Sequence, residues 1–408
     1  MIDEKQVEQI VEKLIERVNK ANTLFLKSIG SSIKEIGELT PTEAHQLVQM
    51  LKYGDSYDRL IKEISKYTDM NVKDIDKIFK VYAKKDQQFY KKFYQYRNKP
   101  FISYEKNVAL QNQTKALSNV VSNQMYNFTR DNVLGYTING RFYNLRDTYN
   151  RVLDEAFINV SQGKLTFDSA MSSILEDIGG SGLKTLEYES GRSMRLDSAV
   201  RMHLKGRLRE LHNENQKIMG EEFNANGVEI TVHANPAPDH QDIQGRQFSN
   251  EEFEKLQKDG IAKDINDREY DLHLELKNGE TAEGFRPISA YNCYHVTMSI
   301  VLGVSKPRYN DEQLQKIIDD NNKGFELDGE HYTNYQGTQM QRSIEKAIRE
   351  QKDIQILGKS SGNEELIAKS EEQIRILTNK YYELSKKSGL PTKLERIRVD
   401  NYIPVAKK

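Results

Sequence analysis

The chain has 408 residues, of which 37% are hydrophobic and 30% are charged, and its mean hydropathy is -0.76. A chain of this length and polarity is expected to form two or three domains with long amphipathic helices rather than one compact enzyme core. The 60 Lys and Arg residues balance the 61 Asp and Glu residues. This balance argues against a general polyanion-binding protein, so any contact with nucleic acid must come from a local patch.

The chain has one cysteine, Cys293, which excludes an internal disulfide framework and fits synthesis in a reducing cytoplasm. The first residues, MIDEKQVEQI, are charged and lack the apolar segment of a secretory signal. The longest apolar stretch, 298–304, is far too short to cross a bilayer. We therefore expect a protein without a membrane segment.

The region 1–182 has the pattern of amphipathic helices, because apolar residues recur at steps of three and four between Glu and Lys. Thr40 followed by Pro41 predicts a helix start, with Thr40 as the N-cap. Asn71 predicts a second start. These signals indicate an extended helical amino-terminal region.

Two segments interrupt this helical pattern. An Asn-Gly pair between β-prone residues predicts a hairpin over 134–141. The sequence Gly-Gly-Ser-Gly at 179–182 predicts a flexible break. The division of the chain is therefore expected near residue 182.

Basic and aromatic residues alternate over 89–99. Phe89, Phe93 and Tyr96 fall at helical spacing, so we expect them to pack into a core. The remaining rings are predicted to mark a protein interface. Stacking on single-stranded nucleic acid is the alternative.

The second half of the chain changes its periodicity twice. A long basic helix is predicted over 183–226, and alternating apolar residues then predict strands within 227–309. Among these strands, one is expected near 228–232, one near 272–276 and a buried one over 294–304. Beyond 310 the pattern is helical and charged. The fold class is therefore mainly α, with an extended helical amino-terminal region (1–182), the long basic helix (183–226), a small α+β module (227–309) and a helical carboxy-terminal extension (310–408).

The α+β module holds a dense set of side chains that can bind a metal: His233, His240, Cys293 and His295. On one strand, Cys293 and His295 would point to the same side. Two histidines with a Cys-x-His pair make a chemically sensible tetrahedral zinc set, with a structural role. Ordinary turns with hydrogen-bonded histidines are the alternative.

The same residues admit an enzymatic interpretation. Cys293 and His295 could act as a nucleophile and its base, with Asp239 as a third group, or the set could hold the zinc of a nuclease or hydrolase. The sequence supplies no recognisable oxyanion hole, and no Gly-rich phosphate loop. We therefore expect no enzyme.

A local basic patch is predicted on the helix that follows residue 190. A phosphate-contacting face of this helix would let the chain act as a DNA-binding packaging factor, whereas the alternative is the charged outer face of an amphipathic helix. The candidate residues are Arg192, Arg195, Arg201, Lys205, Arg207 and Arg209.

The order of these features resembles the phage minor capsid protein 2 family, which is related to the Mu F-like head morphogenesis proteins. The likeness covers about 185–310. The motifs that carry it are the basic helix, then Pro-x-x-His240, Gln244-Gly-x-x-Phe, and Asn292-Cys-x-His295. The chain departs from the family pattern at Tyr294, where an Arg is usual, which puts a charge-dependent role there in doubt.

This resemblance implies a minor structural protein of a tailed-phage head, made in the host cytoplasm and located in the virion. It implies attachment to the portal protein or inner head, contact with other head proteins and a few copies per particle. It also leaves open contact with packaged DNA and passage with DNA during ejection. The region 310–408 would be a variable extension.

Overall fold

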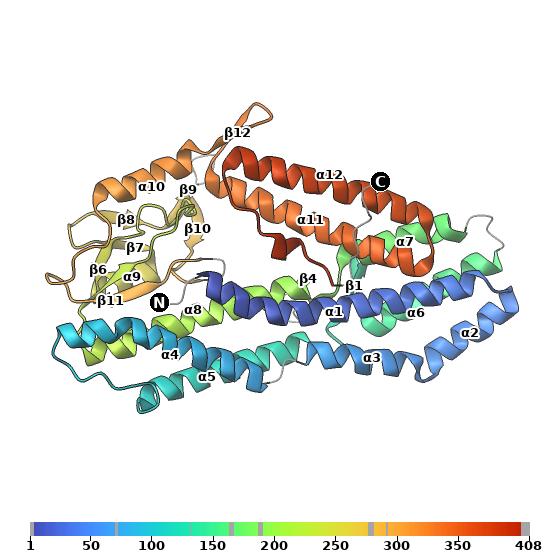
Figure 1. Cartoon of the computed structure of the whole chain (residues 1–408), viewed down its shortest axis with the longest axis horizontal. Helices are drawn as coiled ribbons and strands as arrows, with labels where there is room; N and C mark the ends of the chain where they lie inside the picture. Colours follow the sequence, from blue (N-terminus) through green and yellow to red (C-terminus); the bar gives the residue numbers. More distant parts are fainter. Residues whose placement is uncertain are drawn as a thin grey trace. The chain divides into compact units, whose positions relative to one another are not determined.

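The structure is a computed structural model that describes residues 4–69, 72–130, 132–162, 167–186, 191–275, 281–290 and 293–400. The fold is mainly α, as predicted, with small antiparallel sheets between the helices (Figure 1). The helices are α1 (Glu4–Gly37), α2 (Pro41–Tyr53), α3 (Asp55–Thr68), α4 (Val72–Tyr96), α5 (Val108–Phe128), α6 (Leu145–Ser161), α7 (Phe167–Ser181), α8 (Leu196–Glu222), α9 (Asn250–Asp259), α10 (Asp311–Lys323), α11 (Asn334–Ser361), α12 (Glu364–Ser388) and the 3-10 turn η1 (Leu394–Ile397).

The strands are short, and every pair that the structure describes is antiparallel. Their order within the sheets is β2-β1-β3-β4, β11-β5-β6, β10-β9, β12-β13 and β7-β8. The strands are β1 (Leu134–Ile138), β2 (Arg141–Asn144), β3 (Lys184–Leu186), β4 (Ser193–Arg195), β5 (Gly227–Ile230), β6 (Gln247–Ser249), β7 (Ile261–Lys263), β8 (Glu269–Asp271), β9 (His273–Glu275), β10 (Thr281–Phe285), β11 (Thr297–Ile300), β12 (Phe325–Leu327) and β13 (Glu330–Tyr332).

The chain divides into two compact units, each built from three separate segments. Unit 1 comprises 1–10, 71–122 and 202–339, and unit 2 comprises 11–70, 123–201 and 340–408. Neither unit has a border at 182, 226 or 309. The predicted division of the chain into four regions at those three positions therefore stays a prediction.

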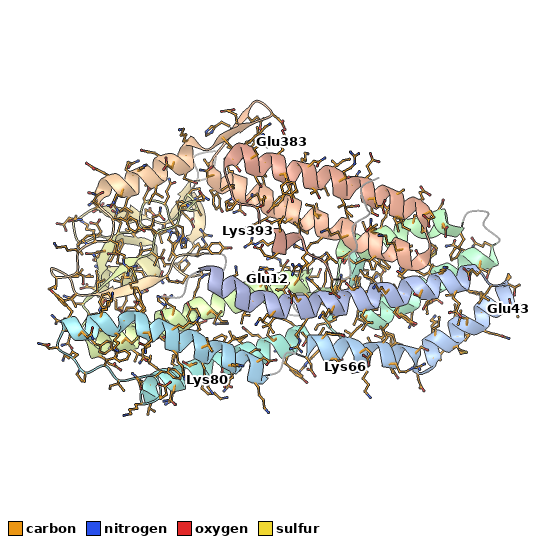
Figure 2. All side chains as sticks on the ribbon, in the orientation of Figure 1. Glu12, Glu43, Lys66, Lys80, Glu383 and Lys393 are labelled. Carbon is orange, nitrogen blue, oxygen red and sulfur yellow. The ribbon has the colours of Figure 1, made fainter. Side chains whose placement is uncertain are left out.

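Local sequence signals set several element ends where they were predicted. Thr40 is the N-cap of α2 and Pro41 is its first residue. The carboxylate of Glu43, a residue that Figure 2 labels, accepts a hydrogen bond of 3.1 Å from the Thr40 backbone N–H and so closes the cap. The hairpin of β1 and β2 is also confirmed, since Asn139 and Gly140 both take the positive φ that a two-residue turn of this kind requires. The other predicted cap, Asn71, lies outside the described residues.

The predicted flexible break at 179–182 is wrong for its first three residues, because α7 continues through Ser181. Gly179 lies where a side chain would collide with Ile354, with backbone and side-chain atoms within 2.8 Å of an ideal Cβ. Only Gly182 leaves the helix, with a φ of 60°. The glycines therefore permit close packing in unit 2 rather than motion.

The aromatic residues of α4 are buried in a different register from the predicted one. Tyr90 and Tyr94 are fully buried, whereas Tyr96 is 74% exposed. Tyr90 stacks on Phe223 at 6.4 Å between ring centroids, within unit 1. The buried face of α4 therefore includes these two tyrosines, because the Tyr90 ring lies beside His212 of α8 and the Tyr94 hydroxyl donates to Glu222.

The core of unit 2 contains a cluster of buried charges, which we call the buried ion cluster: Arg195, Asp197, Arg349 and Asp353. Arg195 donates to Asp353 at 3.0 Å and lies 3.4 Å from Asp197. Burial raises the pKa of Asp353 to about 6, although the charge of Arg195 acts against this rise. Burial also disfavours the charge on Asp197, but Arg195 and Arg349 outweigh it and lower the pKa of that carboxyl.

The buried ion cluster is joined to the sheet of unit 2 through one amide. Asn22 donates to Asp353 at 3.0 Å, and its oxygen accepts from the Tyr136 hydroxyl at 3.0 Å and from the Leu183 backbone N–H at 2.9 Å. Helix α1, strand β1 and helix α11 therefore share one polar network. The carboxy-terminal helices are part of this unit's core.

We expect Asp353→Ala to lower the free energy of unfolding by about 3 kcal/mol, because it removes the carboxylate that accepts from the buried Arg195 guanidinium and leaves Asp197 as the remaining partner. Denaturant unfolding followed by circular dichroism measures this loss. Lys369→Ala is the control, since Lys369 and Glu176 form an exposed pair that should contribute less than about 1 kcal/mol. Equal, small losses in the two variants would contradict the structural role of the cluster.

Candidate functional site

The sheet β11-β5-β6 of unit 1 brings the predicted metal-binding residues together. Strands β5 and β11 pair with Ile230 opposite Thr297, and the backbone N–H of Thr231 continues the pairing to Val296. The segment 231–246, which leaves β5, therefore starts beside the segment 286–296, which enters β11. His240 lies on the first segment, and Cys293 and His295 lie on the second.

The strand predicted over 294–304 is shorter than expected. β11 begins at Thr297, so Cys293 and His295 belong to a loop and their common direction does not come from strand alternation. The Cys293 backbone N–H donates to the Ala290 carbonyl oxygen at 2.9 Å. The strand predicted near 272–276 is described only in part. Strand β9 covers His273–Glu275, and residue 276 lies outside the described residues.

Strand β5 is buried on both sides rather than half-buried as predicted. Val228 and Ile230 belong to an apolar cluster with Phe248. Glu229 is also buried, and its carboxylate accepts from Gln247 at 2.8 Å. Burial raises the pKa of Glu229. The alternation of charged and apolar residues therefore did not indicate which side of the strand faces solvent.

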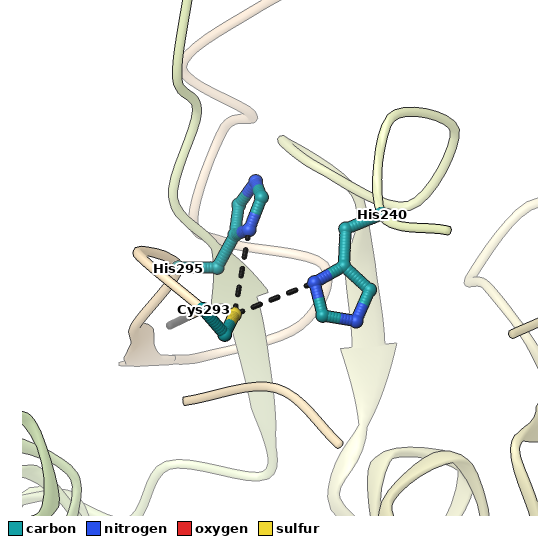
Figure 3. A group of neighbouring side chains, drawn as sticks. All are labelled: His240, Cys293 and His295. Carbon is teal, nitrogen blue, oxygen red and sulfur yellow. Dashed lines mark hydrogen bonds between the residues drawn. The ribbon is translucent and has the colours of Figure 1, made fainter. Parts of the chain in front are cut away.

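Three of the four predicted metal-binding residues converge, and we call them the His/Cys cluster: His240, Cys293 and His295 (Figure 3). Their ligand atoms all lie within 4.8 Å of one another. The Cys293 Sγ lies 3.3 Å from the His240 Nδ1 and 3.7 Å from the His295 Nδ1. The three residues are at most 3% exposed.

The far nitrogen of each ring in the His/Cys cluster has a fixed acceptor. The Nε2–H of His240 donates to the Arg286 carbonyl oxygen at 2.7 Å. The Nε2–H of His295 donates to the Gln244 Oε1 at 3.3 Å. That oxygen also accepts from the His233 backbone N–H at 2.9 Å, which fixes the orientation of the amide. Both Nδ1 lone pairs therefore face the sulfur.

Two further contacts hold the loop around the cysteine. The Ser289 N–H donates to the Cys293 Sγ at 3.3 Å, and the Ser289 hydroxyl donates to the His295 carbonyl oxygen at 2.7 Å. The Arg286 guanidinium forms a two-point ion pair with Asp239, at 2.7 and 3.0 Å. Arg286 and Ser289 were not among the predicted site residues, and no sequence pattern pointed to them.

His233, the fourth predicted ligand, lies beside the His/Cys cluster without joining it. Its Nε2–H donates to the Tyr294 carbonyl oxygen at 2.7 Å. Its ring centroid is 4.7 Å from that of His295, with the rings nearly perpendicular. His233 therefore packs against a cluster residue and holds the backbone between Cys293 and His295.

The burial of the His/Cys cluster favours its neutral protonation states. Burial raises the pKa of the Cys293 thiol and lowers the pKa of both His240 and His295. A thiol with a raised pKa and almost no exposure is a poor nucleophile. The buried, protonated state of the free thiol therefore argues against covalent catalysis by Cys293.

The predicted basic patch does not form one exposed face. Arg192 is exposed, but Arg195 and Lys205 are buried, and Arg201, Arg207 and Arg209 are partly buried. Within unit 2, Arg195 belongs to the buried ion cluster and Arg201 pairs with Glu12. Within unit 1, Arg207 pairs with Glu210 and Arg209 lies over the Tyr294 ring. The predicted helix over 183–226 is wrong at its start, because α8 begins at Leu196, Arg195 lies in β4 and Arg192 precedes that strand. The other four candidates do lie on α8, but their charges are largely matched inside the fold.

Comparison with known proteins gives one finding. A family model described as phage minor capsid protein 2 matches residues 2–384. The match continues well beyond 310, so it includes most of the predicted carboxy-terminal extension. No curated protein and no solved structure matches the chain. Over the helices that the structure describes, none has an apolar stretch of the length that a membrane crossing requires.

We expect Gln244→Leu to lower the free energy of unfolding by about 1–3 kcal/mol, because it leaves the His233 N–H and the His295 Nε2–H buried without an acceptor. Urea unfolding of the full chain measures the change. The matched control is Gln315→Leu at an exposed helical position, expected within about 0.5 kcal/mol of the parent. A Gln244 variant as stable as the control would exclude this role of the amide.

Proposed function

This chain belongs to the phage minor capsid protein 2 family, and from that membership we propose that it attaches to the portal or the inner face of the head and acts through assembly. As a minor capsid protein it is a component of the phage particle and a partner of other head proteins. The observation that supports the proposal is the extent of the match, which takes in residues of both compact units. The full chain, not one module, is then the unit that assembles.

A function in assembly agrees better with the His/Cys cluster than a catalytic one. The cluster joins two segments that have little regular structure of their own, and its side chains are almost completely buried. A substrate would need access to the Cys293 sulfur or to an ion held by the cluster. The residues instead stabilise the loops that frame β5 and β11.

Contact with packaged DNA has weaker support than contact with protein. A phosphate-binding face needs accessible Lys and Arg side chains with uncompensated charge. Arg195 and Lys205 are buried, and Arg201 and Arg207 already pair with carboxylates. We therefore propose that any role in packaging or ejection acts through the portal.

Purified particles test this proposal directly. We expect mass spectrometry of gradient-purified phage to find the chain in a few copies per particle, and the full chain to bind the purified portal protein of the same phage. Particles that have ejected their DNA show whether the chain stays in the head. A chain that is missing from infectious particles and does not bind the portal would contradict the proposal.

A turnover assay tests the enzymatic alternative separately. We expect no hydrolysis of DNA, RNA or ester substrates above that of a His240→Asn variant, with zinc supplied to both proteins. A rate that disappears in His240→Asn but persists in the exposed-site variant His331→Asn would establish the nuclease or hydrolase hypothesis instead.

A further inference from the structure

Without a bound ion, the three side chains of the His/Cys cluster have one hydrogen-bond donor fewer than their facing lone pairs require. Both rings carry their proton on Nε2, because the Arg286 carbonyl and the Gln244 amide oxygen each require a donor. Each Nδ1 therefore offers a lone pair to the same sulfur. One S–H can donate to one of them, which leaves the other buried lone pair facing sulfur lone pairs. A buried polar group left without a partner in this way destabilises the fold.

A metal ion removes this conflict, because it accepts all three lone pairs. At a tetrahedral zinc ion with Zn–S of about 2.3 Å and Zn–N of about 2.0–2.1 Å, a sulfur and a nitrogen ligand lie about 3.6 Å apart. The two S···N separations in the cluster, 3.3 and 3.7 Å, lie on either side of this value. Figure 3 shows both rings turned with Nδ1 toward the sulfur.

The surroundings of the cluster match those of metal ligands. Histidine ligands usually donate their second N–H to a carbonyl or carboxylate, which fixes the tautomer and the ring orientation. Both histidines do so here, and the Arg286 that supplies one carbonyl is itself held by Asp239. The Ser289 N–H, which donates to the sulfur, would stabilise the negative charge of a bound thiolate.

We propose that His240, Cys293 and His295 bind one structural Zn²⁺ ion through Nδ1, Sγ and Nδ1. Binding releases the thiol proton of Cys293 to solvent. The borderline-soft nitrogen and sulfur set selects zinc over Mg²⁺ or Ca²⁺, which take oxygen ligands. The ion ties the segment 231–246 to the segment 286–296, and this site is independent of portal attachment.

Metal analysis of the full chain tests the proposal. We expect about one zinc per chain in protein purified without chelators, and about one after dialysis against Zn²⁺ of chelator-treated protein. Replacement of zinc by Co²⁺ should give intense d–d bands and a thiolate-to-cobalt charge-transfer band, which report a tetrahedral site with a sulfur ligand. Protein that is folded and takes up neither ion would overturn the proposal.

Variants identify the ligands. We expect His240→Asn, Cys293→Ser and His295→Asn each to reduce the zinc content at least tenfold. His331→Asn is the matched control at an exposed position away from the cluster, and it should keep its zinc. A zinc content in His240→Asn or His295→Asn equal to that of His331→Asn would overturn the three-residue assignment.

Misfolding of a ligand variant does not weaken this test, because the parent chain provides a second measurement. Alkylation of Cys293 in the folded parent should be at least tenfold slower with Zn²⁺ bound than after chelation, and Zn²⁺ should restore the protection. The cobalt charge-transfer band must disappear on the same alkylation. Equal alkylation rates with and without Zn²⁺ would show that the sulfur is not a ligand.

Discussion

Two hydrogen bonds behind the imidazole rings determine the chemistry of the His/Cys cluster. The Arg286 carbonyl and the Gln244 amide oxygen hold the ring protons on Nε2, so both Nδ1 atoms must present lone pairs to the Cys293 sulfur. This constraint lies in the backbone and in one amide, not in the ligands themselves. If the proposed Zn²⁺ ion is bound, the two hydrogen bonds orient both imidazole rings for it, and the ion would join the two loops beside β5 and β11.

The same requirement for internal partners governs unit 2, where the buried groups carry full charges. Arg195 is enclosed with Asp197 and Asp353, and Asn22 links the second carboxylate to Tyr136 and to the Leu183 backbone N–H. In a protein with 30% charged residues, some charges must be enclosed when long helices pack together. Buried pairs of this kind add little net stability compared with apolar side chains, but they penalise every arrangement of the helices that separates them. The cluster therefore contributes specificity to the packing of α1, β4 and α11.

Features that depend on neighbouring residues could be predicted from the sequence, and features that depend on distant ones could not. The α2 start at Thr40 and the Asn139-Gly140 turn follow from local backbone geometry, and both are present. The Gly179 prediction failed because the distant Ile354 occupies the space beside that glycine. The residue types of a metal site were recognisable in the sequence. Which of them come together, and that Arg195 is buried, depends on contacts between residues more than 50 positions apart in the chain. The sequence therefore did not show that His233 stays outside the cluster.

The interleaved origin of the two units determines the order in which the protein can fold on the ribosome. Unit 1 takes its last segment from 202–339, and unit 2 needs the residues from 340 onward, since Asp353 supplies the counter-charge of Arg195. Neither unit can complete its fold while only the first half of the chain has been translated. Until then, the apolar faces of the first helices stay exposed. A premature stop codon after residue 339 would therefore remove α12, most of α11 and the Asp353 carboxylate from unit 2, instead of merely shortening a dispensable tail.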